Sequence, residues 1–282
     1  MISSASKLDL KLNHLVIRGE EIRRVHLSEI STLIIENTAI SLTAALLCEL
    51  SKRKIKIIFC DEQRNPYGEL VPYYGSHDAT DKLRSQICWD DGIKGQVWME
   101  IIKEKIRKQS LVLADCGRFE QADLLNSYIE EITPFDRTNR EGHAAKVYFN
   151  ALFGMGFSRK DDCPINSCLN YGYSVLLSAF NREISISGYL TQLGIFHDNT
   201  YNPFNLGSDL MEPFRPLVDR CVIDMEPKAI SPDEKRQLVD VLNKEVIIDD
   251  RKNVLINAMR IYTKSVFDAI NEQDIHCLRF YE

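Results

Sequence analysis

The chain has 282 residues and a formal net charge of −6, and 44% of its residues are hydrophobic. This length suits one large domain or two modest ones, and the hydrophobic content provides a core, which excludes a disordered chain. The net acidity argues against a general nucleic-acid coat protein. The eight cysteines are scattered, and Cys163 and Cys168 lack the second pair of a structural zinc site, so we expect reduced thiols.

The sequence also argues against a signal peptide and a membrane span. No apolar segment interrupts the polar start MISSASKLDLKLN. The most apolar stretch is LIIENTAISLTAALLCEL, and Glu36 and Asn37 divide it. We therefore expect a soluble protein of the bacterial cytoplasm.

Short strands are expected up to about residue 75. Alternating apolar residues predict strands in SKLDLKLNHLVIRGEEIRRVHL, with turns at Leu12-Asn13 and Arg18-Gly19. A further strand is predicted in STLIIEN, a helix in SLTAALLCELSKR and a buried strand in KIKIIFCD. Most of this region is therefore expected to be β-structure.

Proline and glycine mark the end of this region. The segment RNPYGELVPYYGSHD contains Pro66, Gly68, Pro72 and Gly75. Such residues predict turns and the exit from a domain. We expect a small β-rich N-terminal domain over residues 1–77.

From residue 79 onward, apolar residues recur at three- and four-residue spacing, which predicts helices. These helices are expected in DKLRSQICW, GQVWMEIIKEKIRKQSLVLAD, RFEQADLLNSYIEEI, NREGHAAKVYFNALFG, NYGYSVLLSAFNREISI and the amphipathic region from Asp233 onward. In the fourth segment, Asn139 is the expected N-cap and Gly154 the expected stop. We therefore expect an α+β chain with a larger, all-helical domain over residues 78–282.

Acidic side chains are concentrated after His197, since residues 201–250 contain 6 basic and 11 acidic side chains. Asp209 and Glu212 are three residues apart, so one helical turn places both carboxylates on one face. Pro213 is tolerated only in or near the first turn of a helix, because proline has no N–H to donate to the helix backbone. Spacing alone favours a solvated helix start, and a lone histidine is usually structural. Together, however, the imidazole and the carboxylates suit manganese or magnesium.

Other charged residues remain open between a functional and a structural explanation. Glu141 opens a predicted helix, where the helix dipole also favours an acid. A basic run either contacts phosphates or, more commonly, forms an ordinary helix face: Lys103, Lys105, Arg107 and Lys108. The FGMGF segment lacks the third glycine and the preceding strand of a dinucleotide loop. These residues alone predict no more than a divalent-metal site in a helical domain.

Three segments in order resemble the CRISPR-associated adaptation integrases: NREGHAAKVYFNALFG, LNYGYSVLLSAFNREISISGYLTQLGIFHDN and NPFNLGSDLMEPFRPLVD. They contain the glutamate, the histidine of G-x-x-H and the acid pair of D-L-M-E-P-F-R-P in the family's order. The likeness continues in HLSEISTLIIENTAIS and KIIFCDEQRNPYGELVPYYGSHD, which resemble the family's N-terminal β domain. It thus covers almost the whole chain, and it is closest to the branch that accompanies single-protein effector nucleases (type II).

The resemblance implies that Glu141, His197 and Glu212 are catalytic ligands of Mg²⁺ or Mn²⁺, with Asp209 as an auxiliary ligand or an acid behind the ligands. It implies an endonuclease and integrase that joins 3′-hydroxyl ends of captured double-stranded DNA to a CRISPR repeat by transesterification. The implied partners are a second copy in a homodimer and a small ferredoxin-like adaptation protein that completes a heterohexamer. In type II systems an effector nuclease and a ring-forming DNA-end binder join them.

Some alternatives stay open. The acids could cap helices in a non-catalytic DNA-binding scaffold of the same fold, or belong to an unrelated small-molecule metallohydrolase. Arg215 could contact phosphate or pair with Asp219. Family members usually begin with a short W-R strand, which the start MISSASKL largely lacks. The resemblance therefore does not extend to the family's first strand and the partner contacts that this strand makes.

Overall fold

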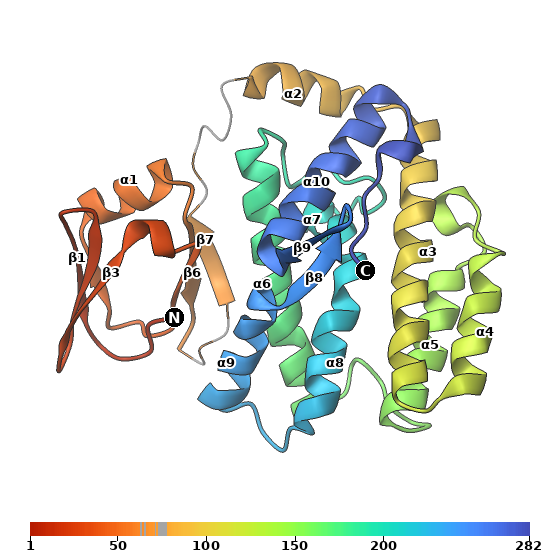
Figure 1. Ribbon diagram of the computed structural model, residues 1–282, viewed down its shortest axis with the longest axis horizontal. Coiled ribbons are helices and arrows are strands. Elements are labelled where there is room, and N and C mark those ends of the chain that lie inside the picture. Colours follow the sequence, from red (N-terminus) through yellow and green to blue (C-terminus); the bar gives the residue numbers. More distant parts are fainter. Residues whose placement is uncertain (63, 65, 71, 73–77) are drawn as a thin grey trace. The chain divides into compact units, whose positions relative to one another are not determined.

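The computed structural model describes residues 1–282 apart from 63, 65, 71 and 73–77 (Figure 1). Contacts divide the chain into two compact units, Met1–Ser76 and His77–Glu282. This division lies one residue from the boundary expected after residue 77, whereas the domain exit expected at Gly75 falls outside the described residues. Strands prevail in the first unit and helices in the second.

The first unit contains a four-stranded sheet of order β3-β2-β1-β5 and a three-stranded sheet of order β4-β6-β7. The elements are β1 (Lys7–Lys11), β2 (His14–Arg18), β3 (Ile22–His26), η1 (Leu27–Glu29), β4 (Thr32–Ile35), β5 (Ser41–Leu42), α1 (Ala44–Lys52), β6 (Lys56–Cys60) and β7 (Pro66–Leu70). Apolar side chains from both sheets and from α1 form a common core in this unit. The expected β-rich character is confirmed.

The turn between β1 and β2 forms where the sequence predicted it. Leu12 and Asn13 have φ angles of 48° and 62°, and Lys11 pairs with His14 across them. A two-residue turn with positive φ angles matches the right-handed twist of antiparallel strands. The turn predicted at Gly19 likewise separates β2 from β3. Both turns follow from local backbone preferences.

The segment from Pro66 to Leu70 forms strand β7, so the prediction of turns there was wrong. β7 lies at the edge of its sheet and pairs antiparallel with β6. Proline cannot donate a ladder hydrogen bond, but it is tolerated as the first residue of an edge strand. A buried ion pair between Glu69 of β7 and Lys56 of β6 links the two strands. Pairing with β6 therefore outweighs the local turn preference.

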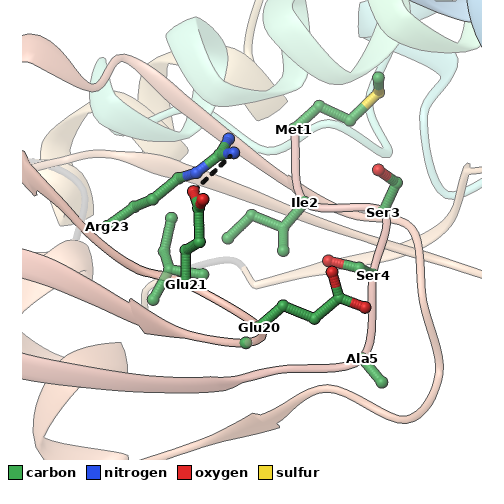
Figure 2. A pocket seen from close by; sticks show the side chains of 10 residues that line it. Met1, Ile2, Ser3, Ser4, Ala5, Glu20, Glu21 and Arg23 are labelled. Atoms are coloured by element: carbon green, nitrogen blue, oxygen red, sulfur yellow. Dashed lines mark ion pairs between the residues drawn. The ribbon is translucent and has the colours of Figure 1, made fainter.

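A pocket of about 560 Å³ opens in the first unit, between residues 1–5 and the turn after β2 (Figure 2). Ile2, in the segment before β1, forms one parallel bridge with Ile35 of β4. Figure 2 shows Arg23 directed towards Glu21, and these exposed side chains form a 3.5 Å ion pair. Exposed ion pairs contribute little energy. The polar lining is exposed throughout, which is unlike a specific ligand site.

The second unit is mostly helical. Its elements are α2 (Ala79–Ile87), α3 (Asp91–Asp115), α4 (Phe119–Ile129), η2 (Pro134–Asp136), α5 (Arg140–Phe153), α6 (Pro164–Ile186), α7 (Asn205–Leu210), η3 (Glu212–Phe214), α8 (Arg215–Met225), α9 (Pro232–Asp240), η4 (Val241–Asn243), β8 (Glu245–Ile248), β9 (Arg251–Val254), α10 (Leu255–Glu272) and η5 (Ile275–Cys277). Figure 1 shows α3, α4 and α5 side by side, and α3 also packs against η3, α8 and α10. The long α3 is therefore central to this unit.

Two helix ends show how the sequence sets the boundaries in this unit. The side chain of Asp90 accepts the N–H of Ile93 at 3.1 Å and begins α3. Gly154, with φ of 102°, ends α5 and donates its N–H to Asn150. Glycine adopts this angle without the steric cost that a Cβ imposes. The predicted stop at Gly154 is confirmed.

A hairpin of β8 and β9 interrupts the C-terminal region that we expected to be entirely helical. Asp249 and Asp250 have φ angles of 53° and 59°, which suit the two-residue turn of a hairpin. Val246 and Ile248 are buried on one face of β8. The α+β class with a mostly helical second part is nevertheless confirmed. Among the described helices, none combines the length and apolar character of a membrane span.

Candidate active site

The predicted site residues lie in four segments of the second unit. Glu141 is in the first turn of α5, His197 in the loop after α6, Asp209 in α7 and Glu212 at the start of η3. The fold brings Glu141 and Glu212 to a common point, because an oxygen of each lies 2.5 Å from Nζ of Lys105. Asp209, by contrast, contacts His197. The two acids of the sequence motif, Asp209 and Glu212, thus contact different partners.

The loop before α5 fixes Glu141. One oxygen of Asp136 accepts the N–H of Arg140 at 2.9 Å, and the other accepts the N–H of Glu141 at 2.8 Å. Asn139 occupies the predicted cap position, but its side chain makes no cap bond, so Asp136 caps the helix instead. Phe135, Asp136 and Asn139 all have positive φ angles. Such strained backbone persists where surrounding contacts enforce it, often at functional sites.

Asp209 is completely buried and holds both the backbone and the ring of His197. Its Oδ1 accepts the N–H of His197 at 3.1 Å and lies 2.6 Å from Nδ1 of the ring. Its Oδ2 accepts the N–H groups of Ile195 at 2.6 Å and Phe196 at 3.1 Å. Since Nδ1 is committed to the carboxylate, Nε2 is the nitrogen that can bind a metal. This geometry favours Asp209 as an orienting acid over an auxiliary ligand.

Aromatic packing also fixes the loop that carries His197. The ring of Phe196 stacks on the buried ring of Trp98 at 4.5 Å with an interplanar angle of 9°. The ring of His197 meets Trp98 edge-on at 5.7 Å. Stacked and edge-on pairs both suit the charge distribution of aromatic rings. Trp98 comes from α3, so α3 helps to place the histidine.

Electrostatics link His197 to both glutamates. The hydrogen bond with Asp209 is the main cause that raises the pKa of His197 above its ordinary value, and burial opposes it. The negative charges of Glu212 and Glu141 also raise the pKa of His197. The imidazole therefore lies within electrostatic reach of both carboxylates.

Glu212 is almost completely buried between two cations. Its Oε1 lies 2.9 Å from Nη2 of Arg215, and its Oε2 lies 2.5 Å from Nζ of Lys105. Burial opposes ionisation, but Arg215 and Lys105 together hold the pKa of Glu212 below its ordinary value. The guanidinium of Arg215 also lies over the ring of Tyr173, 4.9 Å from its centroid. Arg215 thus pairs with Glu212 rather than with Asp219, which was one of the two alternatives left open for it.

Lys105 is the residue that sequence analysis did not assign to the site. We expected it on a basic helix face, but only 6% of its surface is exposed. It lies four residues after Ile101 and eight before Leu113, on the stripe of α3 that faces the core. A charged residue on an apolar stripe is the sequence signal that could have identified it.

The donor chemistry of the site fits a divalent ion. Carboxylate oxygens and an imidazole are ligands that Mg²⁺ and Mn²⁺ accept. The Lys105 ammonium marks a point between Glu141 and Glu212 where a cation is already stabilised. Within the described residues, however, no group of three His, Cys, Asp or Glu side chains is close enough to hold an ion. Metal binding would therefore require Lys105 to move away and the carboxylates and imidazole to move closer together.

Sequence comparison identifies the family. The family model described as CRISPR associated protein Cas1 matches residues 1–237. The CRISPR-associated endonuclease Cas1 of Neisseria meningitidis serogroup C (strain 8013) is 36% identical over 255 residues, which cover 88% of this chain and 84% of the relative. Both matches extend from the β-rich unit into the helical unit that holds Glu141, His197 and Glu212.

Solved structures agree in fold. A casposase bound to integration product has a TM-score of 0.79 at 18% identity and covers 97% of this chain and 90% of that chain. A chain of a Cas6-RT-Cas1–Cas2 complex has a TM-score of 0.75 at 18% identity and covers 98% of this chain and 35% of that chain. At such identities the likeness shows the fold alone. The family match and the 36% identical relative show more: this chain belongs to the Cas1 family of CRISPR-associated proteins.

Proposed function

We propose that this chain is a divalent-metal-dependent DNA endonuclease and integrase of CRISPR adaptation. It would join 3′-hydroxyl ends of captured double-stranded DNA to a CRISPR repeat by transesterification. Membership of the Cas1 family supports the proposal, because the Neisseria relative is named an endonuclease. The observation that carries it is the convergence of Glu141 and Glu212 on one cation position, within electrostatic reach of His197.

In this mechanism Glu141, His197 and Glu212 would hold Mg²⁺ or Mn²⁺. The ion would supply Lewis-acid activation of the attacking hydroxyl and neutralise charge at the phosphoryl group. Asp209 keeps a proton on Nδ1 of His197, which leaves Nε2 for the metal. Arg215 holds the carboxylate of Glu212 in place.

The reaction exchanges one phosphodiester for another. The 3′-hydroxyl oxygen forms a new bond to phosphorus, the bond to the departing 3′-oxygen breaks, and the proton of the attacking hydroxyl passes to that oxygen. No nucleoside triphosphate is consumed. This balance agrees with a sequence that has no phosphate-binding loop.

The proposed assembly follows from the family resemblance. The β-rich unit would support a homodimer, and a small ferredoxin-like adaptation protein would complete a heterohexamer. The Cas6-RT-Cas1–Cas2 complex supports a Cas2-type partner, because one of its chains shares this fold. If the chain belongs to the type II branch, an effector nuclease and a ring-forming DNA-end binder would join the assembly in the bacterial cytoplasm.

Strand transfer tests the proposed activity. A short duplex with 3′ overhangs, a supercoiled plasmid carrying a repeat, the small partner and Mn²⁺ are incubated with wild type, Glu212→Gln or Glu100→Gln. Glu100 is the matched control, because it lies on α3 and pairs with Lys103 at a partly exposed site. We expect Glu212→Gln to lower the rate by about 10²–10³-fold or more, and Glu100→Gln to retain it. Circular dichroism checks that each variant is folded.

One observation favours a second candidate function. The Lys105 ammonium already neutralises Glu141 and Glu212, as it would in a non-catalytic DNA-binding scaffold. DNA binding without strand transfer by either wild type or Glu212→Gln would support that scaffold, whereas equal strand transfer by both would contradict the catalytic role of Glu212. The other alternative, an unrelated small-molecule metallohydrolase, is wrong because the chain belongs to the Cas1 family.

A further inference from the structure

The ammonium of Lys105 lies at the centre of the proposed metal site. Its Nζ is 2.5 Å from Oε1 of Glu141 and 2.5 Å from Oε2 of Glu212, and the side chain is 7% exposed. The Oε2 atom of Glu212 is buried, so its ion pair with Lys105 is shielded from bulk water. The ammonium therefore holds the two carboxylates together by charge.

Glu141 and Glu212 place two negative charges against the Lys105 ammonium. With Arg215 on the other oxygen of Glu212, two positive groups match two negative groups. The site is therefore electrically balanced without a metal ion.

A divalent ion and this ammonium cannot share the same place. Mg²⁺ lies about 2.0–2.1 Å from its oxygen ligands, and the space between the two carboxylates is already filled by Nζ. An added ion would also leave the balanced site with two excess positive charges. Like charges at such short range repel strongly away from bulk water. One cation must leave when the other binds.

We propose that Lys105 is a positioning residue which keeps Glu141 and Glu212 converged in the metal-free protein and competes with the divalent ion for them. The inference rests on the proposed metal site. It follows that the protein's metal affinity is set partly by the free energy of displacing Lys105.

The test measures Mn²⁺ binding by calorimetry to wild type, Lys105→Met and Lys103→Met. Lys103 is the matched control, because it lies two residues away on α3 and pairs with Glu100 at 2.9 Å in a partly exposed position. We expect Lys105→Met to bind Mn²⁺ about tenfold or more tightly than wild type, since a competing charge is removed. Lys103→Met should change the affinity by less than about twofold.

Thermal unfolding gives a second measurement. Metal-free Lys105→Met should unfold at a lower temperature than wild type, because two buried carboxylates lose their counter-ion. Saturating Mn²⁺ should raise its unfolding temperature by more than it raises that of wild type. A lysine with a merely structural role would lower stability without increasing metal affinity. If Lys105→Met does not fold without metal, Lys105→Gln replaces it in both measurements.

The outcomes separate this inference from the proposed function. Equal or weaker Mn²⁺ binding by the Lys105 variant overturns the competition. If wild type binds Mn²⁺ and Glu212→Gln abolishes that binding, the metal site stands even when the competition is overturned. If neither wild type nor the Lys105 variant binds Mn²⁺, both the competition and the proposed metal site are wrong.

Discussion

Substituting Asp209 by asparagine would distinguish an orienting acid from an auxiliary metal ligand. The two oxygens of Asp209 accept four N–H donors: three from the backbone of Ile195, Phe196 and His197, and one from the ring of His197. Asparagine keeps one oxygen and replaces the other by an amino group. If the amino group faces Ile195 and Phe196, both of their N–H groups lose their acceptor. If it faces His197, the backbone N–H of His197 loses its acceptor and the ring must change tautomer.

The expected magnitude follows from these contacts. A buried donor without an acceptor costs about 1–3 kcal/mol, so the loss of one or two acceptors in Asp209→Asn should lower the free energy of unfolding by about 1–6 kcal/mol. If the amino group faces His197, the ring must keep its proton on Nε2, which blocks metal binding. Substituting the partner of a ligating histidine lowers metal affinity about 10–100-fold. Stability should therefore fall in either orientation of the amide, and metal affinity should fall with it when the amino group faces His197.

Urea unfolding of the metal-free protein and Mn²⁺ calorimetry measure the two effects. Asp198→Asn is the matched control, because Asp198 is the next residue after His197 and is exposed. It should change the free energy of unfolding by less than about 0.5 kcal/mol. A stable Asp209→Asn protein that binds Mn²⁺ weakly would refute the orienting role, because only a direct ligand acts through the metal alone.

Three further predictions concern the packing around the site. Burial raises the pKa of Asp219 to about 6, although the hydroxyls of Tyr148 and Tyr173 oppose this. As the pH rises, the unfolded chain loses the Asp219 proton at a lower pH than the folded chain does. The free energy of unfolding should therefore fall by about 3 kcal/mol between about pH 4 and 6. Urea unfolding of Asp219→Asn should lack that fall. Asp136→Ala should lose about 0.5–2 kcal/mol of stability in urea unfolding, because it removes the cap of α5. It should also slow strand transfer. Unchanged values would contradict the capping role. Gly172→Ala should lower stability by about 1–3 kcal/mol in the same assay, because its Cβ would clash with Val218 of α8; a neutral result would show that α6 and α8 separate easily.

Several features of the fold were predictable because they depend on a few neighbouring residues. The turn at Leu12-Asn13 and the end of α5 at Gly154 follow from backbone angles that these residue types adopt. The order of Glu141, His197 and Glu212 in the chain was enough to recognise the family, which the family match confirmed. By contrast, β7 was missed because its pairing partner β6 supplies the hydrogen bonds that a local turn signal ignores.

The sequence by itself determined the class of the fold, most helix positions and the residue types available for the site. Only the tertiary structure decided how these residues are used. Asp209 and Glu212 share one motif, yet one orients His197 and the other meets Lys105. The physical reason is that backbone preferences act over a few residues, whereas burial and charge pairing depend on side chains that the fold brings from distant segments. The sequence places Lys105 on the apolar stripe of α3, but only the packing of α3 against α5 and η3 places it between two glutamates.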